Sequence, residues 1–235
     1  QEAIDLSDAD KVVKDKDLVQ RLESTVIRWT RQIKELVNLQ DNSQDAETAG
    51  PLNEINFWNE RTIDLSGIRE QLHDPRVLRI AELLKIVKST YVKPFEELSA
   101  IIHEGSNEAE DNLKFLSCLK PVCEELESST PPEVGDLLPK VLKIIRMIWT
   151  ISTHYKKKER LAGLLRKVSN QIMSRCCAYI PLDGVFKKEG DVNFSVNCLN
   201  DCIACGNVWR EEYKKTKRAI AKAKNVENWD FPESS

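Results

Sequence analysis

Glycine and proline are scarce in this sequence of 235 residues, which contains 8 and 9 of them. This scarcity disfavours a β fold rich in glycine turns, and apolar and charged contents of 41% and 31% disfavour a disordered chain. Long apolar runs are also missing, because the best candidate contains Lys143 and Arg146. No segment therefore predicts a membrane span. A soluble all-α protein is the class that remains.

Motifs for catalysis and nucleotide binding are missing as well. The sequence has no GxxxxGK[ST] or GxGxxG loop to hold phosphates and no GxSxG turn for a nucleophilic serine. Its three histidines, His73, His103 and His154, are isolated and match no HExxH pattern. Paired acids such as Glu96 and Glu97 lie on predicted helices, where a solvated face is the simpler interpretation. We expect no enzymatic activity and no cofactor in this segment.

Charge is balanced overall but uneven along the chain. The net charge of -3 provides no global field for nucleic acid or membranes. Residues 104–133 are mainly acidic, whereas the run from Arg210 to Lys224 has seven bases and two acids. Opposed patches can dock protein subunits, although neighbouring helices could equally neutralise them. The basic run has no groove-reading motif, which disfavours nucleic-acid binding. The candidate protein-interaction residues are Arg210, Lys214, Lys215, Lys217, Arg218, Lys222, Lys224 and, outside any periodic stripe, Trp229.

Seven cysteines form an odd set that suits no disulfide framework, so we expect free thiols. Cys198, Cys202 and Cys205 have the CxxxCxxC spacing that binds an iron–sulfur cluster in some enzymes. The same spacing continues a helical stripe through Trp209, which favours packing over a cluster. A zinc site is weaker still, because no histidine follows His154. We predict no metal site.

Apolar periodicity predicts long helices separated by short polar breaks. A heptad seam from Leu22 to Leu36 lasts little more than two repeats, which favours a bundle over a free coiled coil. Whether such seams close within one chain or between two stays open. His73-Asp74-Pro75 predicts a break with Asp74 as the cap of the next helix. The cysteine stripe belongs to a last helix whose predicted apolar face runs from Phe194 to Ile220.

These patterns predict an all-α fold, an elongated bundle of long antiparallel helices. We expect a flexible acidic lead-in over 1–17 that ends at Asp17, the candidate N-cap of the first confident helix. A first helical bundle over 18–127 and a second over 133–224 follow, with a linker over 225–235. The second bundle contains a helical hairpin and the C-terminal helix. Because the chain begins at Gln1 and has no leader, we interpret it as part of a longer protein.

The hairpin from Val141 to Tyr179 also carries a family resemblance. Together with four further blocks, which occur in the same order as in the family, it resembles the N-terminal tail of axonemal dynein heavy chains. The resemblance covers about Leu18 to Tyr179 and is greatest to a beta-type chain of the two-headed inner arm. The triplet Lys156 to Lys158 departs from the family pattern. The other blocks are VIRWTRQIKE, GPLNEINFWNERTIDLSGIREQL, YVKPFEEL and NLKFLSCLKP.

The resemblance implies a non-catalytic tail segment of a minus-end-directed microtubule motor in the axoneme of a cilium or flagellum. The implied partners are a second dynein heavy chain, intermediate and light chains, and docking proteins on the doublet microtubule. ATP and magnesium are expected in a remote AAA+ ring of the parent chain. Two alternatives stay open: a free-standing helical adaptor or cytoskeletal scaffold, and a metal or redox enzyme built on the C-terminal cysteines.

Overall fold

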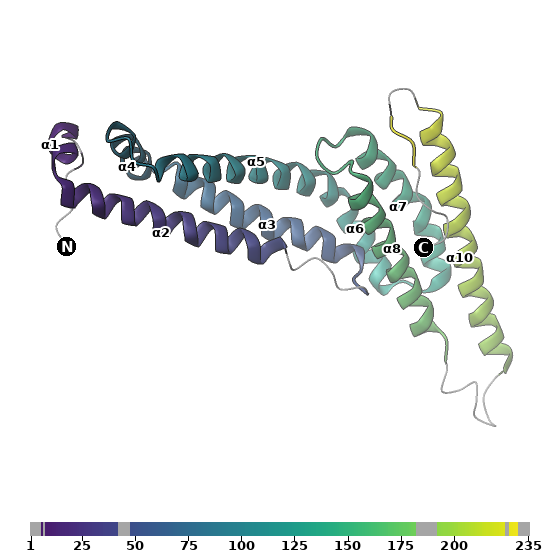
Figure 1. Cartoon of the computed structure of the whole chain (residues 1–235). Helices are drawn as coiled ribbons and strands as arrows, with labels where there is room; N and C mark the ends of the chain where they lie inside the picture. The colour runs from purple at the N-terminus through teal and green to yellow at the C-terminus, as the bar shows by residue number, and fades with distance from the viewer. Residues whose placement is uncertain (1–5, 7, 42–47, 182–191, 224–225, 230–235) are drawn as a thin grey trace. The chain divides into compact units, whose positions relative to one another are not determined.

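The computed structural model describes residues 6, 8–41, 48–181, 192–223 and 226–229 (Figure 1). Within these ranges the regular structure is helical and contains no strand, so the predicted all-α class is confirmed. No helix in the described ranges is long and apolar enough to cross a membrane. The helices are α1 (Ala9–Lys14), α2 (Lys16–Asp41), α3 (Pro51–Leu72), α4 (Pro75–Ile86), α5 (Val92–Leu116), η1 (Ser117–Leu119), α6 (Lys120–Ser128), α7 (Pro131–Ile151), α8 (Lys158–Tyr179) and α10 (Val192–Ala221).

The chain divides into two compact units. Unit 1 comprises Gln1–Asp45 and Asn59–Glu110, and unit 2 comprises Ala46–Trp58 and Asp111–Ser235. The divisions fall within α3 and α5, so each of these helices contributes residues to both units. The break predicted between the two bundles lies instead inside unit 2, between α6 and α7. The division into bundles over 18–127 and 133–224 stays a prediction.

The predicted flexible lead-in is wrong for the residues just before α2. Asp8 accepts a hydrogen bond from the backbone N–H of Lys11 (3.2 Å) and begins α1, which buries Val12. Asp15 then accepts from the backbone N–H of Leu18 (3.0 Å), so the cap of α2 is Asp15 rather than Asp17. The acidic side chains suggested flexibility, but they satisfy backbone N–H groups at two helix starts.

Unit 1 packs α2, α4 and parts of α3 and α5 around aliphatic side chains. The predicted break is confirmed, because α3 ends at Leu72 and Asp74 accepts from the backbone N–H of Arg76 (2.8 Å). On α5, Phe95 places its ring 6.3 Å from that of Trp29. The buried residues of the unit include Leu22, Val26, Leu65, Leu72, Ile80, Leu83, Leu84, Val92, Phe95, Leu98 and Ile102.

Unit 2 is built on the predicted hairpin, which α7 and α8 confirm. The first turn of α7 is closed by Glu133, which accepts from the backbone N–H of Thr130 (2.7 Å). Asp111 accepts from the backbone N–H groups of Thr153 and His154 in the turn (3.0 and 3.1 Å). α10 lies along α7 (Figure 1). The apolar face of α7 is buried through Val134, Leu138, Val141, Leu142, Ile145, Ile148 and Trp149.

Candidate protein-interaction site

The predicted basic patch lies on the C-terminal half of α10. Arg210, Lys215, Arg218 and Lys222 are exposed, Lys214 and Lys217 are half-buried, and Lys224 lies outside the described residues. Two of these lysines form ion pairs one turn away on the same helix: Lys214 with Glu211 (3.4 Å), and Lys215 with Glu212. These pairs offset part of the local positive charge. The role of the patch in docking stays a prediction.

Trp229 is 1% exposed, although its position outside any periodic stripe made it a candidate contact residue. Its ring stacks on that of Tyr213 of α10 at 5.6 Å between centroids. Two residues earlier, Glu227 accepts a hydrogen bond from Trp149 Nε1 through its backbone oxygen (2.8 Å) and pairs with Lys158 through its carboxylate (3.0 Å). The described part of the predicted linker therefore packs onto unit 2, and Trp229 belongs to the interior.

The cysteine trio faces the interior of unit 2. Cys198 and Cys205 are buried, and the half-buried Cys202 donates to the backbone oxygen of Cys176 (3.7 Å). Burial first, and then a side-chain hydrogen bond with Cys176, raises the pKa of Cys202 to about 12. Burial also raises the pKa of Cys205 and of Cys176. A raised pKa lowers the thiolate fraction of Cys202, Cys205 and Cys176, and metal ligation and nucleophilic attack require thiolates. Among the described residues, no group of three or more His, Cys, Asp or Glu is arranged to hold a metal ion.

A buried carboxylate at Glu54 was missed by the sequence analysis. Glu54 Oε1 accepts from Trp58 Nε1 (2.8 Å) and from the Tyr155 hydroxyl (2.9 Å), and Oε2 pairs with Lys167. Burial, followed by the adjacent Glu54 charge, raises the pKa of Tyr155. Because both oxygens are engaged and a cation compensates the charge, this carboxylate is suited to joining α3, α8 and the hairpin turn rather than to acid–base catalysis.

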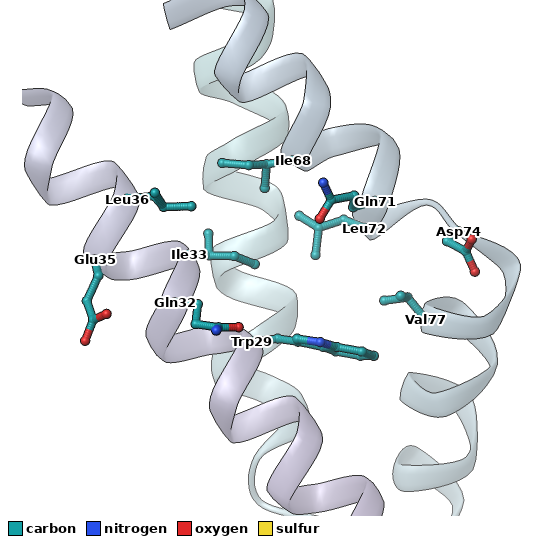
Figure 2. Close-up of a pocket in the computed structure, with 10 residues that line it drawn as sticks. All are labelled: Trp29, Gln32, Ile33, Glu35, Leu36, Ile68, Gln71, Leu72, Asp74 and Val77. Carbon is teal, nitrogen blue, oxygen red and sulfur yellow. The ribbon is translucent and has the colours of Figure 1, made fainter. Parts of the chain in front are cut away.

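The heptad seam of α2 lines an open groove in unit 1. It has a volume of about 630 Å³ and lies between α2, the end of α3 and the start of α4. Figure 2 shows Ile33 and Leu36 pointing across the space toward Ile68 and Leu72, while the Trp29 indole reaches toward Val77. The remaining lining residues are Gln32, Glu35, Gln71 and Asp74.

The seam is covered at one end and open at the other. Leu22 and Val26 are buried within unit 1, Trp29 and Ile33 are half-buried, and Leu36 is 50% exposed. The polar residues lie at the margin: Figure 2 shows Glu35 directed away from the cavity, and it pairs with Arg31 (2.9 Å). An apolar floor with a polar margin is the arrangement that receives the apolar face of a helix.

Comparison with known proteins identifies the class to which these helices belong. The family described as dynein heavy chain, N-terminal region 1, matches residues 19–235. The chain belongs to the dynein heavy chain family. It is 49% identical over 231 residues, 98% of its length, to the dynein-1-beta heavy chain of the flagellar inner arm I1 complex of Chlamydomonas reinhardtii. It is also 47% identical over 67% of its length to dynein axonemal heavy chain 2 of Homo sapiens, and 31% identical over 75% to the flagellar outer arm beta chain of Chlamydomonas reinhardtii.

These similarities confirm the predicted family and the predicted resemblance to a beta-type heavy chain of the inner arm. They also extend the resemblance beyond Tyr179 to the end of the chain. The relatives are axonemal, ciliary or flagellar heavy chains by name, which supports the predicted location in the axoneme. The chain spans only 5% of the Chlamydomonas inner-arm chain and 4% of the human one.

Proposed function

We propose that this chain is a non-catalytic tail segment of an axonemal dynein heavy chain that scaffolds assembly of the dynein complex. In this proposal the segment associates with a second heavy chain and with intermediate and light chains, and helps to dock the motor on the doublet microtubule. The parent motor hydrolyses ATP, with magnesium, in a ring outside this segment and drives movement toward the microtubule minus end. Family membership disfavours the alternative of an adaptor unrelated to a motor.

The uncovered half of the α2 seam is the observation that carries the proposal. Trp29, Ile33 and Leu36 continue the spacing of Leu22 and Val26, but they line an open groove instead of a closed core. An amphipathic helix of another dynein subunit would bury these side chains by inserting its own at positions i, i+3 or i+4, and i+7. The seam would then close partly within the chain and partly between chains.

The groove supports a binding function more than an enzymatic one. Its margin is formed by Gln32, Glu35, Gln71 and Asp74, and none of the described residues that line it is a histidine or cysteine that could act as a nucleophile or general base. Asp74 is already engaged as the cap of α4. We therefore expect the isolated segment to show no saturable ATP binding in calorimetry. Saturable binding would contradict the assignment of ATP chemistry to another part of the parent chain.

A charge placed on the groove tests the proposal. In full-length heavy chain expressed in flagella, Leu36→Glu is expected to lower recovery of the second heavy chain or an intermediate chain in the extracted complex by at least about tenfold. Leu78→Glu is the matched control, because Leu78 of α4 is 48% exposed and does not line the groove. Leu36 is already half exposed, so its substitution is expected to leave folding within about 0.5 kcal/mol of wild type. Normal assembly of the Leu36→Glu protein would contradict the proposal.

A further inference from the structure

Two histidines that lie far apart in the sequence come together in unit 1. His73 follows the last residue of α3, and His103 lies on α5. Their ring centroids are 6.3 Å apart, and their ring planes form an angle of 49°. Both side chains are exposed. No local motif joins these residues in the sequence, so their pairing is a product of the fold.

Polar contacts one turn away hold the two helices in register. The Arg69 side chain on α3 donates to the side-chain oxygen of Asn107 (3.3 Å) and pairs with the Glu110 carboxylate (2.8 Å), both on α5. His73 comes four residues after Arg69, and therefore lies on the same face of its helix. His103 comes four residues before Asn107, on the matching face of α5. The backbones thus place the two imidazoles beside each other.

A hydrogen bond fixes the tautomer of His73. Its Nδ1 lies 2.7 Å from the backbone oxygen of Arg69. Because a carbonyl oxygen can only accept, Nδ1 donates its N–H, and the lone pair of the neutral ring is on Nε2. Histidines that bind metals usually donate their other ring N–H to a backbone carbonyl or a carboxylate, which orients the ring and makes the ligating nitrogen more basic. His73 is therefore preorganised as a ligand.

The end of α3 also favours a cation near His73. The last carbonyl groups of a helix carry partial negative charge, and α3 ends at Leu72, immediately before this histidine. Arg69 is a neighbouring cation, but its charge is offset by the carboxylate of Glu110. A positive ion between the two rings would therefore meet little repulsion.

We propose that His73 and His103 bind one divalent transition-metal ion, with zinc as its representative, and that the ion clamps the end of α3 to α5. Imidazole nitrogen suits zinc, nickel and copper, whereas magnesium and calcium prefer oxygen ligands. With Zn–N bonds of about 2.0–2.1 Å, two imidazoles on one ion have centroids roughly 5 to 6 Å apart. A small rotation of two exposed side chains brings the rings from 6.3 Å to this separation. Water molecules would complete the coordination.

The bound ion would act as a cross-link within unit 1. His73 lies between Leu72 and Asp74, which both line the groove beside α2, so the ion would also fix one wall of that groove. This site would replace the expectation, drawn from the isolated positions of the histidines, that the segment has no metal site. The inference goes beyond the proposed function and does not require the groove to bind a subunit.

Calorimetric titration of zinc chloride into the purified chain tests the site. The exposed thiols of Cys118 and Cys177 are first alkylated, so that they do not compete for zinc. We expect one saturable ion with a dissociation constant below about 100 μM. His73→Gln and His103→Gln are each expected to raise this constant at least about tenfold, because each leaves a single imidazole. His154→Gln is the matched control, since His154 belongs to unit 2 and is expected to leave zinc binding unchanged.

Melting followed by circular dichroism provides a second measurement. Zinc should raise the melting temperature of the wild-type chain and of His154→Gln, but not that of the other two variants. Without zinc, all of them should melt like the wild type, because His73 and His103 are exposed and their substitution leaves the core intact.

The double variant His73→Gln/His103→Gln distinguishes a shared ion from separate ones. If both rings hold the same ion, the double variant should bind zinc little more weakly than either single variant. Absence of saturable binding below about 100 μM would overturn the inference. Undiminished binding in the double variant would place the ion elsewhere and would also overturn it. So would two ions per chain of which each single substitution removes one, because the two histidines would then bind adventitious ions separately.

Discussion

The apolar seam of α2 in unit 1 and the apolar face of α7 in unit 2 consist of similar side chains in different surroundings. The apolar face of α7 is covered by the neighbouring helices α6, α8 and α10, which bury Val134, Leu138, Val141, Leu142, Ile145 and Ile148. The seam of α2 is buried only over its first turns and is half exposed at Leu36. Periodicity alone therefore indicates where an apolar face lies, but it does not indicate whether the same chain covers it.

The two units differ in the same way in their polar interactions. Unit 2 contains a buried ion pair between Glu54 and Lys167 and a turn held by Asp111. Unit 1 has ion pairs on its surface, such as that between Lys85 and Glu96 (3.0 Å). Buried polar networks fix one arrangement of helices, whereas surface pairs contribute little. Unit 2 is suited to rigidity, and unit 1 has a face suited to binding.

Substitution of one tryptophan in each unit tests this difference most strongly. Trp149 of α7 is buried, so Trp149→Ala is expected to lower the free energy of unfolding by about 3 to 5 kcal/mol. Trp29 of α2 is half-buried beside the groove, and Trp29→Ala is expected to lower it by only about 1 to 2 kcal/mol. Chemical denaturation, with hydrogen exchange to separate the units, gives both values. Equal losses would remove the distinction between a covered and an open seam.

Removal of one partner from the ion pair of each unit is expected to have the next largest effect. Glu54→Gln leaves the Lys167 ammonium buried without its counter-charge, and it should lower the free energy of unfolding by about 3 kcal/mol. Lys85→Met removes an exposed pair and should change it by less than about 0.5 kcal/mol. Denaturant titration of the two variants measures both changes. A loss below 1 kcal/mol for Glu54→Gln would mean that this pair does not hold unit 2 together.

The thiols of unit 2 provide a third test. Burial, with the charges of Glu127 and Glu124, raises the pKa of Cys123 to about 12, and the pKa of Cys202 is raised to a similar value. A raised pKa lowers the thiolate fraction at pH 8. We therefore expect alkylation of these two thiols to be roughly a hundredfold slower than that of the exposed Cys118 and Cys177, as measured by mass spectrometry.

Denaturant and a chelator distinguish two explanations for slow alkylation of these thiols, namely packing in the interior and a bound metal. Packing predicts that denaturant abolishes it and that a chelator leaves it unchanged. Protection of Cys198, Cys202 and Cys205 that a chelator abolished would instead show a bound metal, and the cluster alternative would replace packing. The interpretation of these α10 thiols as protonated side chains packed in the interior would then be wrong.

Local signals made much of the fold predictable from the sequence. The break at Asp74 and Pro75, and the hairpin that ends at Tyr179, depend on capping, proline geometry and apolar periodicity within a few turns. The cap of α2 was placed two residues too late, because Asp15 and Asp17 have the same capping chemistry and the sequence does not choose between them.

The candidate sites were less predictable, because burial depends on distant neighbours. Glu54 finds its cation 113 residues later in the chain, and no local pattern marks either residue. Phe194 was predicted on the apolar face of the last helix but is exposed, whereas Trp229 was a candidate contact residue but is buried. The charges of α10 indicated docking at its C-terminal half. The exposed apolar side chains of α10, which include Val192, Val196, Leu199 and Ile203, lie in its N-terminal half, where the scarcity of charge was the signal available in the sequence.

The smallest expected effect concerns a helix end in unit 1. Lys88, just after α4, has φ of 58° in the left-handed region, while the backbone N–H groups of Lys88 and Ser89 donate to the carbonyls of Lys85 and Leu84. This is a Schellman ending, in which glycine is preferred because a Cβ atom is strained there. Lys88→Gly is expected to raise the free energy of unfolding of unit 1 by about 1 kcal/mol. Lys88→Ala removes the charge but keeps the Cβ atom, so a similar gain from both variants would attribute the effect to charge. Exchange rates of α4 amides in the two variants measure the difference, and unit 2 amides should not change.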